Sequence, residues 1–155
     1  MTRSEIVAFV ERARADGKRI VFTNGVFDIL HPGHIRYLRA ARALGDLLTV
    51  GVNSDRSVKA LNKAPDRPVS SENERAEVLA ALASVDAVAI FDEATPLEII
   101  TAIQPDILVK GADWGENAIV GRDIVEARGG RVVRIALAEG YSTTKILARA
   151  RGIVD

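Results

Sequence analysis

The sequence predicts an α/β fold in which helices cover both faces of a doubly wound, parallel five-stranded sheet. Short apolar runs rich in β-branched residues alternate with stretches in which apolar residues recur at the helical period. Strands that alternate with helices are joined by right-handed crossovers, which make the strands parallel. The run LLTVGV at residues 47–52 is almost entirely apolar, as expected for a strand buried on both faces.

The elements follow one another in a regular order. The expected strands lie at residues 19–23, 47–52, 87–91, 107–109 and 131–135. The expected helices lie at residues 35–44, 72–83, 96–103, 119–128 and 143–151. Three of these helices have start signals: Ser71 and Glu74 fit a capping box, Thr95 fits an N-cap followed by a proline in the first turn, and Ser142 precedes the last helix.

The composition is that of an ordinary globular chain. Of the 155 residues, 48% are hydrophobic, and 21 basic side chains balance 21 acidic ones. Nucleic acid is therefore not an expected partner, because binding a phosphate backbone needs a basic excess. The chain has no cysteine, which excludes disulfides and thiolate chemistry. It shows neither a signal-peptide pattern nor an apolar run of the about 18 residues that span a membrane, so we expect a cytoplasmic protein with no membrane partner.

Both histidines of the chain lie in one stretch, VFTNGVFDILHPGH at residues 21–34. His31 and His34 flank a Pro-Gly pair where an expected strand passes into an expected helix. Since proline suits the first helical position, we expect His31 at about the N-cap and His34 one turn inside, on the same face. Free N–H groups and the helix dipole favour an anion there. The pattern predicts a phosphate site, with Asp28 at its mouth to hold a hydroxyl, an ammonium or a metal ion.

The segment GVFDILHPGH resembles the G-x-F-D-x-x-H-x-G-H signature of the HxGH nucleotidyltransferase superfamily. The segments TVGVNSD, TPLEIITAIQPDILVKGADW, GRDIVEARGGRVVRI and EGYSTTKI are similar to its D-glycero-β-D-manno-heptose 1-phosphate adenylyltransferase branch. The resemblance implies a single Rossmann-like nucleotidyltransferase domain over residues 1–155. It implies transfer of AMP from ATP to a sugar 1-phosphate by direct in-line attack, giving ADP-heptose and pyrophosphate. It also implies Mg²⁺ bound with the ATP, and a homo-oligomer of two or more chains.

The resemblance further assigns roles to residues of this chain. Its catalytic candidates are His31, His34 and Lys63. Its nucleotide-binding candidates come from the first motif and from the start of the last helix: Thr23, Asn24, Gly25, Val26, Phe27, Gly33, Ser142, Thr143 and Thr144. Simple helix capping by the last three residues is compatible with that role. No dedicated metal ligands are predicted, since the ion would be held mainly by the triphosphate.

Candidate substrate-binding residues are scattered along the chain. They are Asp28, Lys59, Arg67, Lys110, Asp113 and Trp114. Lys110 would pair with a phosphate, Asp113 would accept sugar or ribose hydroxyls, and Trp114 either stacks on a ring or packs in the core. Residues 62–70, polar and with two prolines, are the expected flexible segment at the carboxyl edge of the sheet. The branch usually reads Leu-Lys-Gly there and this chain is one residue longer, so the choice between Lys59 and Lys63 stays open. Arg75 is expected to be structural.

Two alternative functions stay open. A cytidylyltransferase acting on glycerol 3-phosphate or a similar alcohol phosphate shares the segments GADW and EGYSTTKI, but it carries Arg-Thr where this chain has Leu137 and Ala138. A non-catalytic nucleotide-sensing module is the other alternative, and the intact histidine motif speaks against it. Neither G-x-G-x-x-G nor G-x-x-x-x-G-K-[ST] occurs, so the dinucleotide and P-loop phosphate sites are excluded.

Overall fold

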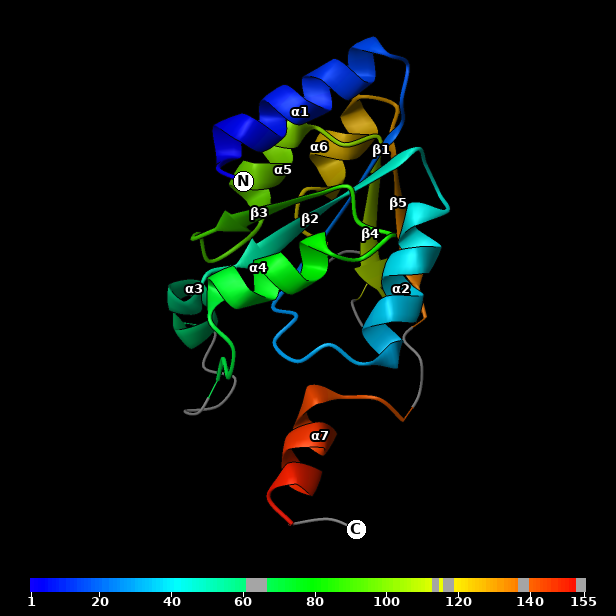
Figure 1. The fold of residues 1–155 in the computed structure, drawn as a ribbon. Helices are drawn as coiled ribbons and strands as arrows, with labels where there is room; N and C mark the ends of the chain where they lie inside the picture. The colour runs from blue at the N-terminus through cyan, green and yellow to red at the C-terminus, as the bar shows by residue number, and fades with distance from the viewer. Residues whose placement is uncertain (61–66, 113–114, 116–118, 137–139, 153–155) are drawn as a thin grey trace.

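The computed structural model describes residues 1–60, 67–112, 115, 119–136 and 140–152 (Figure 1). Its centre is one five-stranded sheet with the order β3-β2-β1-β4-β5, in which all neighbouring strands are parallel. The strands are β1 (Ile20–Gly25), β2 (Leu47–Asn53), β3 (Ala87–Phe91), β4 (Ile107–Gly111) and β5 (Arg131–Ile135). The predicted α/β class with a parallel five-stranded sheet is confirmed.

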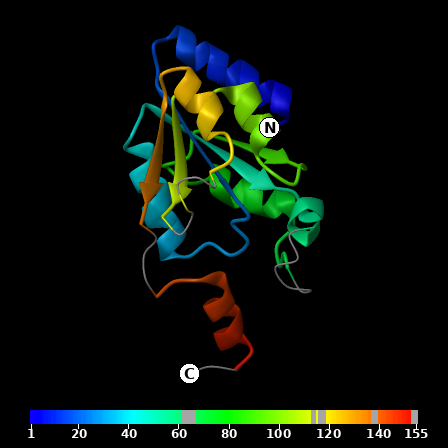
Figure 2. The same ribbon diagram turned by 180° about the vertical axis from the view of Figure 1, so that it is seen from behind.

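The helices of the described residues cover both faces of this sheet (Figures 1 and 2). They are α1 (Arg3–Ala15), α2 (Pro32–Arg42), α3 (Asp55–Ala60), α4 (Glu72–Ala80), α5 (Leu97–Ile103), α6 (Arg122–Ala127) and α7 (Thr143–Ala150). None of them is long and apolar enough to cross a membrane.

Two of these helices were not predicted, and three begin away from the starts that periodicity gave: α2 begins at Pro32 instead of residue 35, α6 at Arg122 instead of residue 119, and α5 at Leu97 instead of residue 96. Helix α1 buries Ile6, Val10 and Ala13 against the sheet, and the short α3 directly follows β2. Helix α5 begins one residue later than expected, because Pro96 itself is the N-cap and its carbonyl accepts the Ile100 N–H. The predicted capping box at Ser71 and the predicted helix start after Ser142 are confirmed.

Side chains that alternate along each strand divide the core into two clusters. On one face, Phe22 of β1 and Leu108 of β4 pack with apolar residues of α1, α5 and α6. On the other face, Val21 and Val109 of the same strands pack with apolar residues of α2 and α4. We refer to these as the α1–α5–α6 face and the α2–α4 face.

The order of the strands reverses at the centre of the sheet. From β1 the chain proceeds outward to β2 and β3, and it then returns to place β4 and β5 on the other side of β1. In open α/β sheets, ligands bind outside the carboxyl ends of the strands at such a reversal. Helix α7 lies below the carboxyl ends of the strands, on the opposite side of the molecule from α1 (Figure 1).

Candidate active site

The N-terminus of α2 carries both histidines, as predicted. His31 is the N-cap residue, with extended backbone, and its Nδ1 accepts the His34 N–H at 3.3 Å. Pro32 occupies the first turn. The two imidazole rings stack, with centroids 3.8 Å apart and an interplanar angle of 16°. The sequence therefore places two imidazoles in contact at the positive end of a helix.

Burial favours the neutral form of both imidazoles. Burial, and then the neighbouring His31, lowers the pKa of His34 to about 4, and burial also lowers the pKa of His31. The edge of Phe27 contacts the His34 ring at a centroid distance of 5.4 Å. The Nδ1 of His34 is buried, and an interaction with the backbone of Ile29 partly opposes the lowering of the His34 pKa. Each neutral ring has one N–H with which it can donate to a phosphate oxygen.

The turn between β1 and α2 has an unusual backbone. Phe27 adopts a positive φ of 50°, and its ring packs against Gly25, where an added Cβ would lie 3.1 Å from the ring. Thr23 is fully buried, and its hydroxyl contacts the Tyr37 hydroxyl at 2.8 Å and donates to the Val109 carbonyl at 3.0 Å. The side chain of Thr23 therefore fixes β1 to its neighbours, which leaves its backbone for the predicted contact with a nucleotide.

Asp28, a predicted substrate-binding residue, makes contacts within the protein that the sequence did not predict. Its side chain is fully buried, it ion-pairs with Arg67 at 2.5 Å, and it accepts the N–H groups of Val69 and Ser70 at 2.8 and 3.0 Å. Arg67, also predicted to contact substrate, is thereby directed to this carboxylate. Both residues hold the described end of the segment 62–70 against the histidine motif, because a buried carboxylate needs such compensation. The sequence did not show this pairing, since the partners come from different elements.

Arg75 has the structural role that the sequence predicts. Its side chain is fully buried, and it donates to the Val26 carbonyl at 2.6 Å, the Ser70 carbonyl at 3.0 Å and Asp55 Oδ1 at 2.6 Å. The guanidinium thus joins the motif turn, the segment before α4 and the start of α3. Five donors in a planar fork suit arginine to this bridging task.

The start of α7 meets the start of α2. Ser142 caps α7 by accepting the Lys145 N–H at 3.1 Å, and the buried Thr143 donates its hydroxyl to the Ile29 carbonyl at 3.4 Å. The Tyr141 ring lies nearly parallel to that of His31, with centroids 6.1 Å apart. Two predicted phosphate-binding helix starts, far apart in the sequence, are therefore neighbours.

Two residues that sequence reasoning missed shape this junction. The Arg36 guanidinium lies 5.3 Å from the centroid of the Tyr141 ring. A Cβ on Gly33 would lie 3.2 Å from Tyr141 Cβ and 2.9 Å from His31 Nδ1, so only glycine permits this close approach. The one signal in the sequence was the position of Tyr141, directly before the Ser-Thr-Thr segment.

The remaining candidates are distributed differently. Lys110 is 8% exposed, its Nζ donates to Asn24 Oδ1, and burial lowers its pKa to about 8. Lys59 is exposed on α3, and Thr144 is exposed in the first turn of α7. Lys63, Asp113 and Trp114 lie outside the described residues.

Comparison with known proteins places this geometry in a family. The cytidylyltransferase-like family model matches residues 22–149. The chain is 58% identical over 145 residues to the bifunctional protein HldE of Hyphomonas neptunium and 57% identical over 140 residues to that of Syntrophotalea carbinolica. These matches cover 94% and 90% of this chain but only 30% and 28% of the relatives, so the chain spans less than a third of their length.

A solved structure extends the similarity to the fold. The lipopolysaccharide core biosynthesis protein from Thermoplasma volcanium superimposes with a TM-score of 0.69 at 31% sequence identity. The match covers 79% of this chain and 100% of that one. The structure comparison therefore supports the α/β fold, and the family model spans both the histidine motif and the start of α7.

Proposed function

The chain belongs to the cytidylyltransferase-like family, and from that premise we propose that it transfers AMP from ATP to D-glycero-β-D-manno-heptose 1-phosphate. The products are ADP-heptose and pyrophosphate. The relatives named HldE and the lipopolysaccharide core biosynthesis protein support this sugar branch. The observation that carries the proposal is the meeting of two helix N-termini, one bearing His31 and His34 and the other Ser142 and Thr143, at the carboxyl edge of the sheet.

The reaction requires positioning and charge stabilisation. A phosphate oxygen of the sugar attacks the α-phosphorus of ATP, a new P–O bond forms, and the bond to the β-phosphate oxygen breaks on the opposite side. Negative charge on the reacting phosphoryl group and on the leaving pyrophosphate must be stabilised. One well-placed donor at such a site contributes about a hundredfold to a thousandfold in rate.

The two helix starts divide this work. His31 and His34, whose burial favours the neutral form, donate N–H hydrogen bonds to the α-phosphoryl oxygens, reinforced by the free amides at the start of α2. The amides at the start of α7, with the hydroxyls of Ser142 and Thr144, take the β- and γ-phosphates. The backbone of residues 23–27 holds the nucleotide at the end of β1.

In this proposal Mg²⁺ binds together with the nucleotide. Among the described residues, no group of three or more His, Asp or Glu side chains is arranged to hold a metal ion. The Asp28 carboxylate is engaged by Arg67 and two amides. These residues fit an ion that is held by triphosphate oxygens and water, as Mg²⁺ usually is in nucleotide sites, where it would neutralise phosphate charge.

The direct test is pyrophosphate release with Mg²⁺, crossing ATP and CTP with heptose 1-phosphate and glycerol 3-phosphate. We expect release only from ATP with the heptose. Release from CTP with glycerol 3-phosphate would instead identify the alcohol-phosphate branch. If all four combinations are silent while ATP binds by calorimetry, the chain is a nucleotide-binding module and the proposed transfer is wrong.

A further inference from the structure

We infer that Asn24 and Lys110 form the subsite for the acceptor sugar phosphate, on the other side of the reacting centre from the histidines. This inference rests on the proposed function. It assigns the side chain of Asn24 to the acceptor, while its backbone stays with the nucleotide, and it assigns Lys110 to the phosphate that attacks.

The first support is position in the sheet. Asn24 is the next-to-last residue of β1, and Lys110 is the next-to-last residue of β4. These two strands are neighbours and flank the point where the strand order reverses. The contact from Lys110 Nζ to Asn24 Oδ1 therefore bridges the crevice in which an open α/β sheet binds its ligand.

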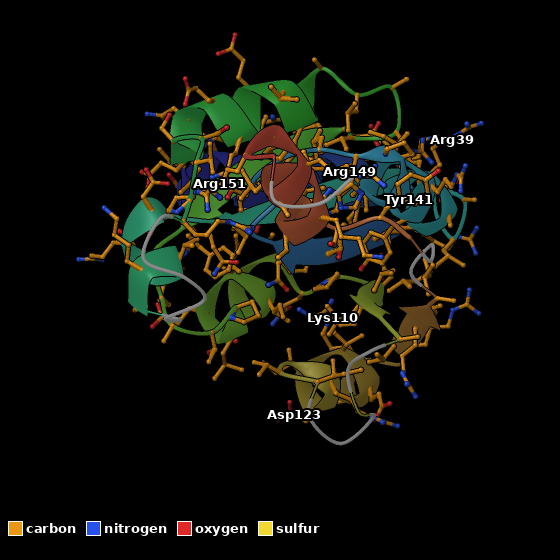
Figure 3. The ribbon with its side chains drawn as sticks, turned by 90° about the horizontal axis from the view of Figure 1, so that it is seen from below. Arg39, Lys110, Asp123, Tyr141, Arg149 and Arg151 are labelled. Atoms are coloured by element: carbon orange, nitrogen blue, oxygen red, sulfur yellow. The ribbon has the colours of Figure 1, made fainter. Side chains whose placement is uncertain are left out.

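The second support is the face of the sheet. Thr23 and Val109, one residue earlier in each strand, point toward α2, since Thr23 contacts Tyr37 and Val109 packs in the cluster of the α2–α4 face. Successive side chains alternate, so Asn24 and Lys110 belong to the α1–α5–α6 face. In the view from below, Lys110 lies toward α6, whereas Tyr141 lies beside α2 (Figure 3).

The third support is the stereochemistry of the reaction. In an in-line displacement, the attacking oxygen and the leaving group lie on opposite sides of the phosphorus. Both helix starts that would hold the triphosphate are joined on the α2 side, through Tyr141 and His31 and through Thr143 and Ile29. An acceptor phosphate held by Asn24 and Lys110 would approach from the other face of the sheet, as an in-line attack away from those helix starts needs.

The chemistry of the pair suits a phosphorylated sugar. Lysine is rarely as buried as Lys110, which is 8% exposed, and an ammonium in low-dielectric surroundings attracts an anion more strongly than one in water. An ammonium can only donate, so its contact must be with the amide oxygen of Asn24. That orientation turns the Asn24 NH₂ group away from Lys110, as a donor for a sugar hydroxyl.

The test compares Michaelis constants for the two substrates in Lys110→Met, which keeps most of the apolar stem and removes the charge. We expect the KM for heptose 1-phosphate to rise at least about tenfold while the KM for ATP changes less than about twofold. Lys18→Met is the matched control, because Lys18 is exposed and lies just before β1, at the opposite edge of the sheet. Equal changes in both constants, or no change in either, would overturn the inference.

Asn24→Ala provides a second variant in case Lys110→Met does not fold, and the same split between substrates is expected. The test also separates this inference from the proposed function. If the wild-type chain transfers no nucleotide to the heptose, the proposed function fails. Calorimetry with heptose 1-phosphate and a non-hydrolysable α,β-methylene ATP analogue then decides: weaker binding by Lys110→Met supports the subsite, and equal binding, or none by either protein, overturns it.

Discussion

The two phosphate-binding helix starts are held in very different ways. Two buried charged groups hold the turn before α2 in place. They are the fully buried carboxylate of Asp28 and the fully buried guanidinium of Arg75. Between them they contact Arg67, the amides and carbonyls of neighbouring segments, and Asp55. The histidine motif is thus tied into the same network as the start of α4.

Helix α7 has no comparable fastening among the described residues. Of its eight residues only Thr143 is buried, and its hydroxyl makes a long bond of 3.4 Å to Ile29. Tyr141, which lies over His31, is 40% exposed. We therefore expect removal of the buried groups that hold the start of α2 to lower the stability of the fold. Substitutions at the start of α7 should lower mainly the affinity for the nucleotide.

Arg75→Met should have the largest effect, and it tests whether the buried network stabilises the turn before α2. Removing the buried guanidinium leaves Asp55 and two carbonyls without their donor, so we expect the free energy of unfolding to fall by about 3–5 kcal/mol in urea titrations. Arg56→Met is the control: Arg56 is exposed, pairs with Asp92, and should cost less than about 1 kcal/mol. Equal losses in the two variants would mean that the motif turn does not depend on this network.

His31→Ala and His34→Ala test whether the two histidines contribute to turnover more than to the stability of the fold. Each should lower turnover by about a hundredfold to a thousandfold, because each removes a donor to the reacting phosphoryl group. For His31→Ala, the N-cap variant, stability should fall by only about 1 kcal/mol, the usual cost of losing a helix cap. Steady-state pyrophosphate release and urea unfolding measure both quantities. Near-normal turnover in both variants would contradict the phosphate site.

The buried histidine should also make stability depend on pH. His34 has a pKa of about 4 when folded and about 6.5 when unfolded. As pH falls from 7 toward 4, the unfolded chain takes up a proton that the folded chain does not, so the free energy of unfolding decreases. We expect a loss of about 1–2 kcal/mol, reduced by the remaining solvent contact of the ring.

Urea unfolding at pH 7, 6 and 5 measures this slope, and His34→Asn is the matched variant because it cannot titrate in that range. The variant should lose less stability than the wild type between pH 7 and 5. Parallel profiles for the two proteins would show that the buried imidazole is not the source of the pH dependence.

Tyr141→Ala should have the smallest effect and tests the loosely held region. Loss of the ring over His31 and beside Arg36 should raise the KM for ATP about threefold to fivefold, as expected for an exposed cation–π contact of about 0.5–1 kcal/mol. The free energy of unfolding should stay within about 0.5 kcal/mol of wild type. Tyr141→Phe keeps the ring and should behave like wild type; a large loss of stability in Tyr141→Ala would contradict the comparison.

The sequence by itself determined the features that depend on near neighbours in the chain. Apolar periodicity located all five strands, and the strand at residues 87–91 has the predicted bounds. Caps and a proline placed the starts of α2, α4 and α7, because a cap is satisfied by an amide two or three residues away. The histidine pair follows from the same local rule, since residues three apart on a helix share a face.

Only the tertiary structure decided which distant side chains meet. The same rules assigned Asp28 and Arg67 to substrate and did not show that these two residues pair with each other. The contact between Lys110 and Asn24 exists because β4 lies beside β1. No local sequence pattern predicts the strand order β3-β2-β1-β4-β5. A buried charge needs a partner, because leaving it unpaired costs several kcal/mol of stability. Packing between elements determines which partner is within reach, and the local sequence does not specify that packing.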